Sequence, residues 1–175
     1  MKRSVFIWQF AGLTFVSVLG TILHFLYDWT GMVAVAPFSA VNESTWEHMK
    51  LFFVPAFLFA FLQSFFFKEE YGNYWCIKTI GIAVGLLFIP VLFYTSNGVF
   101  GKTPDWWNIL SFFLSSGIAY LIEWILFKKR FEKGNETNCL IILFALALCF
   151  IVFTFFPPKI PLFQDPNTGR YGLNA

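Results

Sequence analysis

Long apolar blocks alternate with short polar segments along this chain. Five blocks, at residues 5–26, 51–67, 79–95, 107–127 and 139–156, reach or approach the ~20 residues that a helix needs to cross a bilayer core. The pattern predicts an all-α polytopic membrane protein, a bundle of five transmembrane helices that forms a single domain over residues 1–175. The lipid bilayer is therefore its first expected partner.

Composition supports a membrane location. The 175 residues are 58% hydrophobic, 22% aromatic and 13% charged, and the mean hydropathy is +0.67. Soluble domains carry about 25% charged residues, and a water-soluble fold of this size would leave too much apolar surface exposed. A soluble redox or nucleotide enzyme is excluded, because the chain has neither a Gly-rich phosphate loop nor a redox pair of cysteines. We expect a multi-pass protein of the cell membrane.

Lysine and arginine are distributed unequally between the two sets of loops. One side holds eight cations, Lys2, Arg3, Lys68, Lys78, Lys128, Lys129, Arg130 and Lys133, and the other holds four, Lys50, Lys102, Lys159 and Arg170. The positive-inside rule then predicts a cytoplasmic N-terminus and a C-terminus outside. The formal net charge of +2 is mostly this asymmetry, so we expect no nucleic acid partner.

The three cysteines fall on the predicted cytoplasmic side or within the membrane. They are Cys76, Cys139 and Cys149, and none has the CxxC neighbour typical of a metal site. Disulfides are rare in reducing compartments, so no disulfide is expected.

One polar segment, residues 42–50, interrupts the apolar pattern. It carries Glu43, Glu47 and His48, which are two of the ten carboxylates and one of the two histidines. Ser44 and Glu47 have the spacing of a capping box, which is a sufficient structural explanation for Glu47. If the helix began earlier, Glu43 and Glu47 would share one face and repel each other. A helix N-terminus, a metal, Lys50 or a retained proton would then have to compensate.

The first apolar block carries the other histidine. Gly20, Thr21, His24 and Asp28 recur at spacings of three or four, so they share one helix face, and small residues on it allow a second helix to approach closely. At the outer end of this face, His24 and Asp28 could chelate a metal, or Asp28 could orient His24. A hydrogen-bonded pair at the membrane interface is the structural alternative.

Glu123 lies in the fourth block, about one turn from Lys128, Lys129 and Arg130. Intramembrane carboxylates are costly and usually paired. We expect a structural ion pair with this basic group rather than a proton relay.

The C-terminal segment, residues 157–175, is rich in turn sequences (Asp-Pro, Asn-Thr-Gly and Tyr-Gly). It lies on the predicted outer side, together with His24 and His48. We expect it to fold as a lid over the outer mouth of the bundle, with Asp165 and Tyr171 near the polar residues. Trp46 suits the membrane interface, where its ring is dry and its N–H is wet.

Three segments resemble a known family: His24-x-x-x-Asp28-Trp29-x-Gly31, residues 41–51 around Asn-Glu-Ser-Thr-Trp-Glu-His, and Asp165-Pro166-x-Thr168-Gly169-x-Tyr171-Gly172. They are similar to a family of small bacterial multi-span membrane proteins classed as a domain of unknown function. The resemblance covers essentially the whole chain. It implies a bacterial inner-membrane location but supplies no activity. There is also a similarity in kind to the alkaline ceramidase and adiponectin receptor superfamily, in which membrane-embedded His and Asp residues hold zinc. That superfamily has seven spans and a His-x-x-x-His pair, both missing here.

Three functions remain open, and the sequence does not decide whether the protein is an enzyme. The first is a metal-dependent hydrolase acting on a lipid or lipid-linked substrate at the outer leaflet, with Zn²⁺ or Mn²⁺ bound there. Its residues would be the metal ligands His24, His48 and Asp28 or Glu43, the catalytic carboxylates Glu47 (as general base) and Glu43, and the substrate or lid residues Trp46, Lys50, Asp165 and Tyr171. The second is a non-catalytic protein that binds or transports a cation or small polar solute. The third is a structural or accessory membrane protein, in which the polar cluster acts as a hydrogen-bonded plug.

Overall fold

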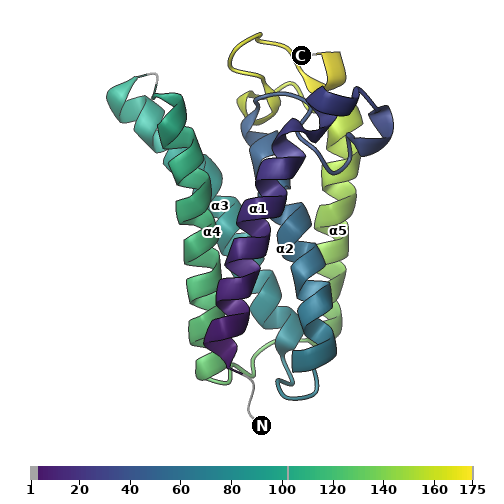
Figure 1. Ribbon diagram of the computed structural model, residues 1–175, viewed down its shortest axis with the longest axis vertical. Coiled ribbons are helices and arrows are strands. Elements are labelled where there is room, and N and C mark those ends of the chain that lie inside the picture. Colours follow the sequence, from purple (N-terminus) through teal and green to yellow (C-terminus); the bar gives the residue numbers. More distant parts are fainter. Residues whose placement is uncertain (1–3, 102, 175) are drawn as a thin grey trace.

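Five long helices run side by side in the computed structural model, which describes residues 4–101 and 103–174 (Figure 1). They are α1 (Val5–Thr30), α2 (Thr45–Phe67), α3 (Tyr74–Phe100), α4 (Asp105–Lys128) and α5 (Glu136–Phe155). Three short 3₁₀ turns, η1 (Val33–Val35), η2 (Pro161–Phe163) and η3 (Gly172–Asn174), gather at the end of the bundle where the C-terminal segment lies. All five long helices are long and apolar enough to cross a membrane, and the described residues form no strand. The predicted all-α, five-helix membrane fold is confirmed.

The helices α2 and α3 form the centre of the bundle. Helix α2 contacts α1, α3 and α5, while α3 contacts α2, α4 and α5, and α1 also packs on α4. Close approach is possible because Gly81 of α3 lies directly against Glu123 and Gly85 against Phe52. Any larger side chain at these glycines would collide with its neighbour. Small residues of this kind are typical of interfaces where two membrane helices pack closely.

The helices α2 and α3 begin before the predicted spans. Helix α2 begins at Thr45 rather than at 51, and α3 begins at Tyr74 rather than at 79. Lys50 and Lys78, which were assigned to loops, are therefore helical and fully buried. Both can be buried because each has a carboxylate partner in the bundle. The excess of cations at one end persists without them, and the orientation of the termini stays a prediction.

Glu123 is paired, but not with the basic residues that were predicted. Its Oε2 lies 2.5 Å from Nζ of Lys78, and both side chains are buried. Lys128 instead places its Nζ 4.7 Å from the centre of the Trp124 ring. The structural ion pair was correctly expected and its partner was wrong, because the early start of α3 brings Lys78 into the core.

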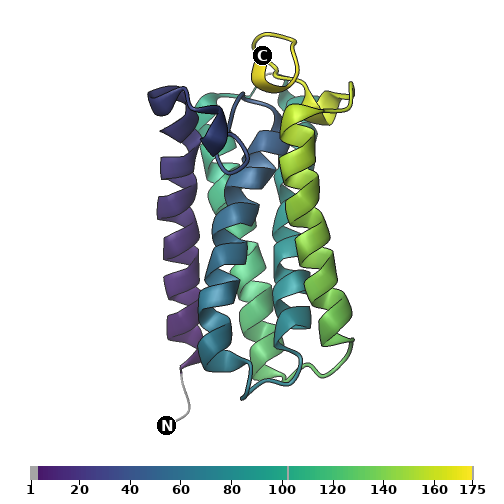
Figure 2. The ribbon, with the colours of Figure 1, turned by 90° about the vertical axis from the view of Figure 1, so that its right-hand side faces the viewer.

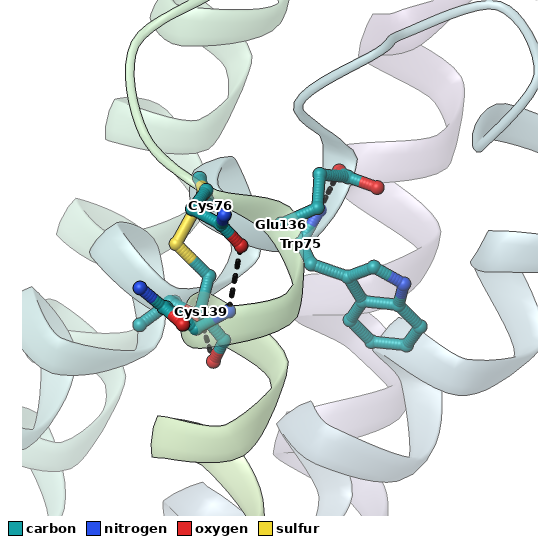
Figure 3. Close-up of a disulfide and its surroundings, with 7 residues drawn as sticks. Trp75, Cys76, Glu136 and Cys139 are labelled. Carbon is teal, nitrogen blue, oxygen red and sulfur yellow. Dashed lines mark hydrogen bonds between the residues drawn. A yellow bond between two sulfur atoms is a disulfide. The ribbon is translucent and has the colours of Figure 1, made fainter.

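A disulfide joins Cys76, near the start of α3, to Cys139, near the start of α5 (Figure 3). The backbone N–H of Trp75 donates to the Glu136 carboxylate (2.8 Å), and the Thr79 hydroxyl donates to the carbonyl of Cys139 (3.0 Å), so hydrogen bonds join the same two helix ends. The expectation of no disulfide is wrong. It was drawn from the predicted cytoplasmic location of these residues, and nothing in the sequence indicated that Cys76 and Cys139, 63 positions apart, lie at adjoining helix ends.

Thiol labelling checks this bond. Protein denatured without reductant should react with maleimide at one thiol per chain, that of Cys149, since Cys76 and Cys139 are joined. After reduction all three cysteines should react. The variant Cys149→Ser is the control and should lose the signal seen before reduction. Labelling of all three thiols in unreduced protein would contradict the bond.

Candidate metal centre

His24, Glu43 and His48 converge at the end of the bundle that carries the C-terminal segment. His24 comes from the last turns of α1, Glu43 from the segment before α2 and His48 from the first turn of α2. One potential ligand atom from each lies within 4.8 Å of the others. The Glu43 Oε2 lies 3.5 Å from Nε2 of His48 and 3.9 Å from Nε2 of His24, and the two imidazole rings are 5.5 Å apart between centroids.

Ser44 sets where α2 begins, and this places the carboxylates of Glu43 and Glu47 in different environments. It is the N-cap of α2: its Oγ accepts a hydrogen bond from the N–H of Glu47 (3.4 Å), and its own N–H donates to Oδ1 of Asn42 (2.9 Å). The helix therefore begins at Thr45, and Glu43 precedes it. Glu43 and Glu47 do not stack on one helix face, so the repulsion considered from the sequence does not arise.

The backbone fixes the tautomer of His48. Its Nδ1 lies 3.0 Å from the carbonyl oxygen of Ser44, and a carbonyl can only accept a hydrogen bond. Nδ1 must therefore carry a proton, and in the neutral ring the Nε2 lone pair is directed toward Glu43. This is the arrangement in which metal-binding histidines are usually held, with one ring nitrogen donating to a backbone or carboxylate oxygen.

The spacing of the three groups fits a tetrahedral ion. With bonds of about 2.1 Å to nitrogen and oxygen, tetrahedral zinc places two ligand atoms about 3.4 Å apart; the two distances from Glu43 are 3.5 and 3.9 Å, and all three ligand atoms lie within 4.8 Å of one another, so binding would draw the group slightly closer together. The side chains of His24, Glu43 and His48 are 29%, 44% and 24% exposed, so an ion and water can reach them. The Nδ1 atom of His24 is buried and has no hydrogen-bond partner among the described residues. The donor set thus fits a divalent metal with a free coordination position.

A cavity of about 520 Å³ adjoins the three residues. Its lining is mostly apolar and includes Leu51, Ile89 and Phe112, from α2, α3 and α4. Figure 1 shows α3 and α4 leaning away from the other helices at this end. The polar group therefore stands at one wall of a largely apolar space.

Asn97, Thr103 and Asn108 form a second polar wall of this cavity, which the sequence analysis did not identify. The backbone N–H of Thr103 and its hydroxyl donate to Oδ1 of Asn97, at 3.0 and 3.1 Å. Oδ1 of Asn108 lies 3.4 Å from the same hydroxyl. Asn and Thr residues at a helix–loop junction are common, so only their convergence on the cavity distinguishes them.

Glu47 and Lys50 lie outside the histidine group. The Lys50 Nζ is 2.6 Å from Oε2 of Glu47 and donates to the carbonyl of Ala36 and the hydroxyl of Thr154, both at 2.8 Å. The N–H of Val41 also donates to Oε2 of Glu47 (3.1 Å). The pair is buried and ties the loop before α2, together with α5, to the first turns of α2. The structure does not bring Glu47 to the position of a general base.

Asp28 and Trp46 also lie apart from the cavity. Asp28 is exposed and is not among the grouped ligands of the described residues. Trp46 is buried against the rings of Phe150 and Phe163, at centroid distances of 4.5 and 4.7 Å. Its Nε1 is buried and has no partner among the described residues, so the expectation of a wet indole N–H is wrong. The early start of α2 carries this residue into the core.

The C-terminal segment reaches the cavity through Pro166 and Asn167. Asp165 shapes the turn, since its Oδ1 accepts a hydrogen bond from the N–H of Asn167 (2.7 Å), and Tyr171 forms an isolated bridge with Gln164. Neither Asp165 nor Tyr171 lines the cavity. Figure 2 shows the segment crossing the end of the bundle, where Nδ2 of Asn42 donates to the carbonyl of Gly172 (3.0 Å).

A model of a family described as being of unknown function (DUF6512) matches residues 2–173. No curated protein and no solved structure matches the chain. The match spans nearly the whole chain, and five apolar helices are consistent with a multi-span membrane family. It assigns no role to any residue.

Proposed function

Since the chain belongs to the family of unknown function DUF6512, we propose its activity from the site alone: a metal-dependent hydrolase of a lipid or lipid-linked substrate. One observation carries the proposal. Three ligand atoms from separate segments lie within 4.8 Å of one another at the wall of a largely apolar cavity. The site lies at the membrane face that the cation asymmetry predicts to be the outer one.

The ligands proposed are Nε2 of His48, a ring nitrogen of His24 and a carboxylate oxygen of Glu43. Two imidazoles and one carboxylate are a donor set that zinc favours, with a fourth position open to water, and manganese would also accept it. Zinc held there would lower the pKa of its water toward about 7 and so supply a nucleophile at neutral pH. The second oxygen of Glu43 would accept the proton. The Ser44 carbonyl keeps His48 in the ligating tautomer.

The cavity supports a substrate with a polar head and an apolar chain. A volume of about 520 Å³ is within the range of small-molecule sites. The apolar wall accommodates a chain, and Asn97 and Asn108 offer amide groups to the head or to the linkage that is cleaved. Transport has less support, because the described charges of the membrane core, Lys78 and Glu123, neutralise each other.

Metal content tests the site. Protein purified in detergent without added metal should hold about one zinc or manganese ion per chain by mass spectrometry. Loss of a residue that only supports a metal ligand typically weakens metal binding roughly 10–100-fold. His24→Ala and His48→Ala each remove a proposed ligand, so each should weaken metal binding by at least that much. Asp28→Ala is the matched control and should keep the metal, because Asp28 is outside the group. Absence of stoichiometric metal after incubation with zinc and manganese would overturn the proposal.

Hydrolysis is tested separately from binding. Nanodiscs containing defined ester, amide and phosphoester lipids are incubated with wild type and His48→Ala, and the products are quantified by mass spectrometry. We expect a product formed only by the metal-loaded wild type. Metal bound without any product would leave a cation-binding protein instead of an enzyme.

A further inference from the structure

A second cavity, of about 180 Å³, lies between α1 and α4 at the opposite end of the bundle. The two helices pack against each other there (Figure 1). The cavity is lined by Gln9, Gly117, Tyr120 and Trp124, together with apolar residues that include Phe10 and Leu13. Phe10 is 64% exposed, so the cavity is a groove on the surface that faces the bilayer.

Buried polar atoms without partners mark this groove. Both polar side-chain atoms of Gln9 and the hydroxyl of Tyr120 are buried and make no hydrogen bond to any described residue. Each of the two residues is only 4% exposed. Unsatisfied polar groups are costly in a membrane, where no water replaces the missing partner. These atoms lie behind the apolar lining of the groove, so a ligand that displaced the neighbouring apolar side chains would supply their missing partners.

A cation stands at the end of the groove. Trp124 is one turn beyond Tyr120 on α4, and Nζ of Lys128 lies 4.7 Å from its ring centre. At 1.5 Å per residue, Lys128 is about 12 Å along α4 from Tyr120, and its ammonium is turned back toward the groove. Lys129 and Arg130 follow and are exposed. The groove thus has positive charge at its rim, then polar groups, then an apolar wall. A glycerophospholipid has the matching sequence of groups: an anionic phosphate, polar esters and apolar acyl chains.

Gly117 provides room for a chain. A Cβ atom at this position would meet nothing within 4 Å, so the surface of α4 is open beside Leu13 and Leu121. A volume of about 180 Å³ holds the ester region and the first methylenes of one chain, and the remainder of the lipid stays in the bilayer.

We propose that this groove binds one anionic glycerophospholipid from the leaflet at the N-terminal end of the bundle. Lys128 holds the phosphate, the Gln9 amide and the Tyr120 hydroxyl bind an ester carbonyl, and an acyl chain lies across Gly117. This site is independent of the metal centre and of the hydrolase proposed above.

Native mass spectrometry in detergent tests the site with three probes: dioleoylphosphatidylglycerol, dioleoylphosphatidylcholine and dioleoylglycerol. Wild type should bind one phosphatidylglycerol about five-fold or more tightly than dioleoylglycerol, the gain of one charge-assisted contact. Gly117→Leu should weaken phosphatidylglycerol binding about ten-fold, because its side chain takes the place of roughly two methylenes. Gln9→Leu should weaken it about five-fold, and Lys128→Gln should remove the preference over dioleoylglycerol.

Gly98→Leu is the matched control, since Gly98 is also a helical glycine whose Cβ would meet nothing within 4 Å. It should bind phosphatidylglycerol as wild type does. Gly117→Leu adds its side chain to open space, so this variant should fold normally. The proposal can therefore still be tested even if Gln9→Leu fails to fold. Equal phosphatidylglycerol binding by wild type and Gly117→Leu would overturn the proposal. A wild type that binds dioleoylglycerol or phosphatidylcholine as tightly as phosphatidylglycerol would overturn the anionic assignment.

Discussion

Replacement of Lys78 by methionine should lower the free energy of unfolding by about 3–5 kcal/mol, the usual cost of leaving one member of a buried ion pair alone. Nζ of Lys78 is 2.5 Å from Oε2 of Glu123, and both side chains are at most 2% exposed. Gly81 lies directly against the Glu123 side chain, so the carboxylate has no room to move to another partner. Thermal unfolding in detergent measures the loss.

The double variant Lys78→Met/Glu123→Leu separates this mechanism from simple loss of packing. Replacing a buried ion pair with apolar residues of similar volume is often neutral, so the double variant should recover most of the stability lost by Lys78→Met. Lys133→Met removes an exposed cation and should change stability by less than about 0.5 kcal/mol. Equal destabilisation by the single and double variants would show that the buried charge is not the cause.

The five helices could be predicted because their signal is local. An apolar block of about 20 residues must be helical to cross a bilayer, whatever its neighbours are. The partner of Glu123 and the disulfide of Cys76 depend on which helix ends adjoin. These contacts bring together residues 45 and 63 positions apart in sequence. Nothing in the spacing of these residues encodes that adjacency.

The candidate metal centre also combines features that the sequence could predict with features that it could not. His24 and His48 could be expected to meet, since both lie at the same end of adjacent spans, and their rings are 5.5 Å apart. Which carboxylate would join them could not be predicted, because it depends on where α2 begins. With Ser44 as the N-cap, Glu43 joins the histidines and Glu47 pairs with Lys50.

The pair of Glu47 and Lys50 also holds the segment that carries Glu43, one of the proposed metal ligands, in position. Lys50 binds the carbonyl of Ala36 and the hydroxyl of Thr154 in addition to Glu47, and Glu47 accepts a hydrogen bond from Val41. These contacts fasten the segment that leads to Glu43. We interpret Glu47 as a positioning residue, and the general-base role considered from the sequence has no geometric support.

Lys50→Met should therefore lower stability and metal affinity together. It leaves the Glu47 carboxylate buried without its cation, at a cost of about 3–5 kcal/mol, and it releases the loop that precedes Glu43. Unfolding measurements and zinc titration of the same sample give the two quantities. The control Thr154→Val removes only one hydrogen bond of Lys50 and should cost about 1 kcal/mol with metal affinity retained.

Glu47→Gln separates positioning from catalysis. The amide oxygen can still accept the hydrogen bonds of Val41 and Lys50, which hold the loop in place, so the metal should remain bound in the folded protein. Stability should nevertheless fall, because Lys50 is left buried without its counter-charge. A positioning role predicts that hydrolysis also survives in this variant, whereas a general base would lose it while keeping the metal. Because the carboxylate is 2% exposed and 2.6 Å from a lysine that is itself buried, it has no path to a water molecule in the cavity, and we expect the first result.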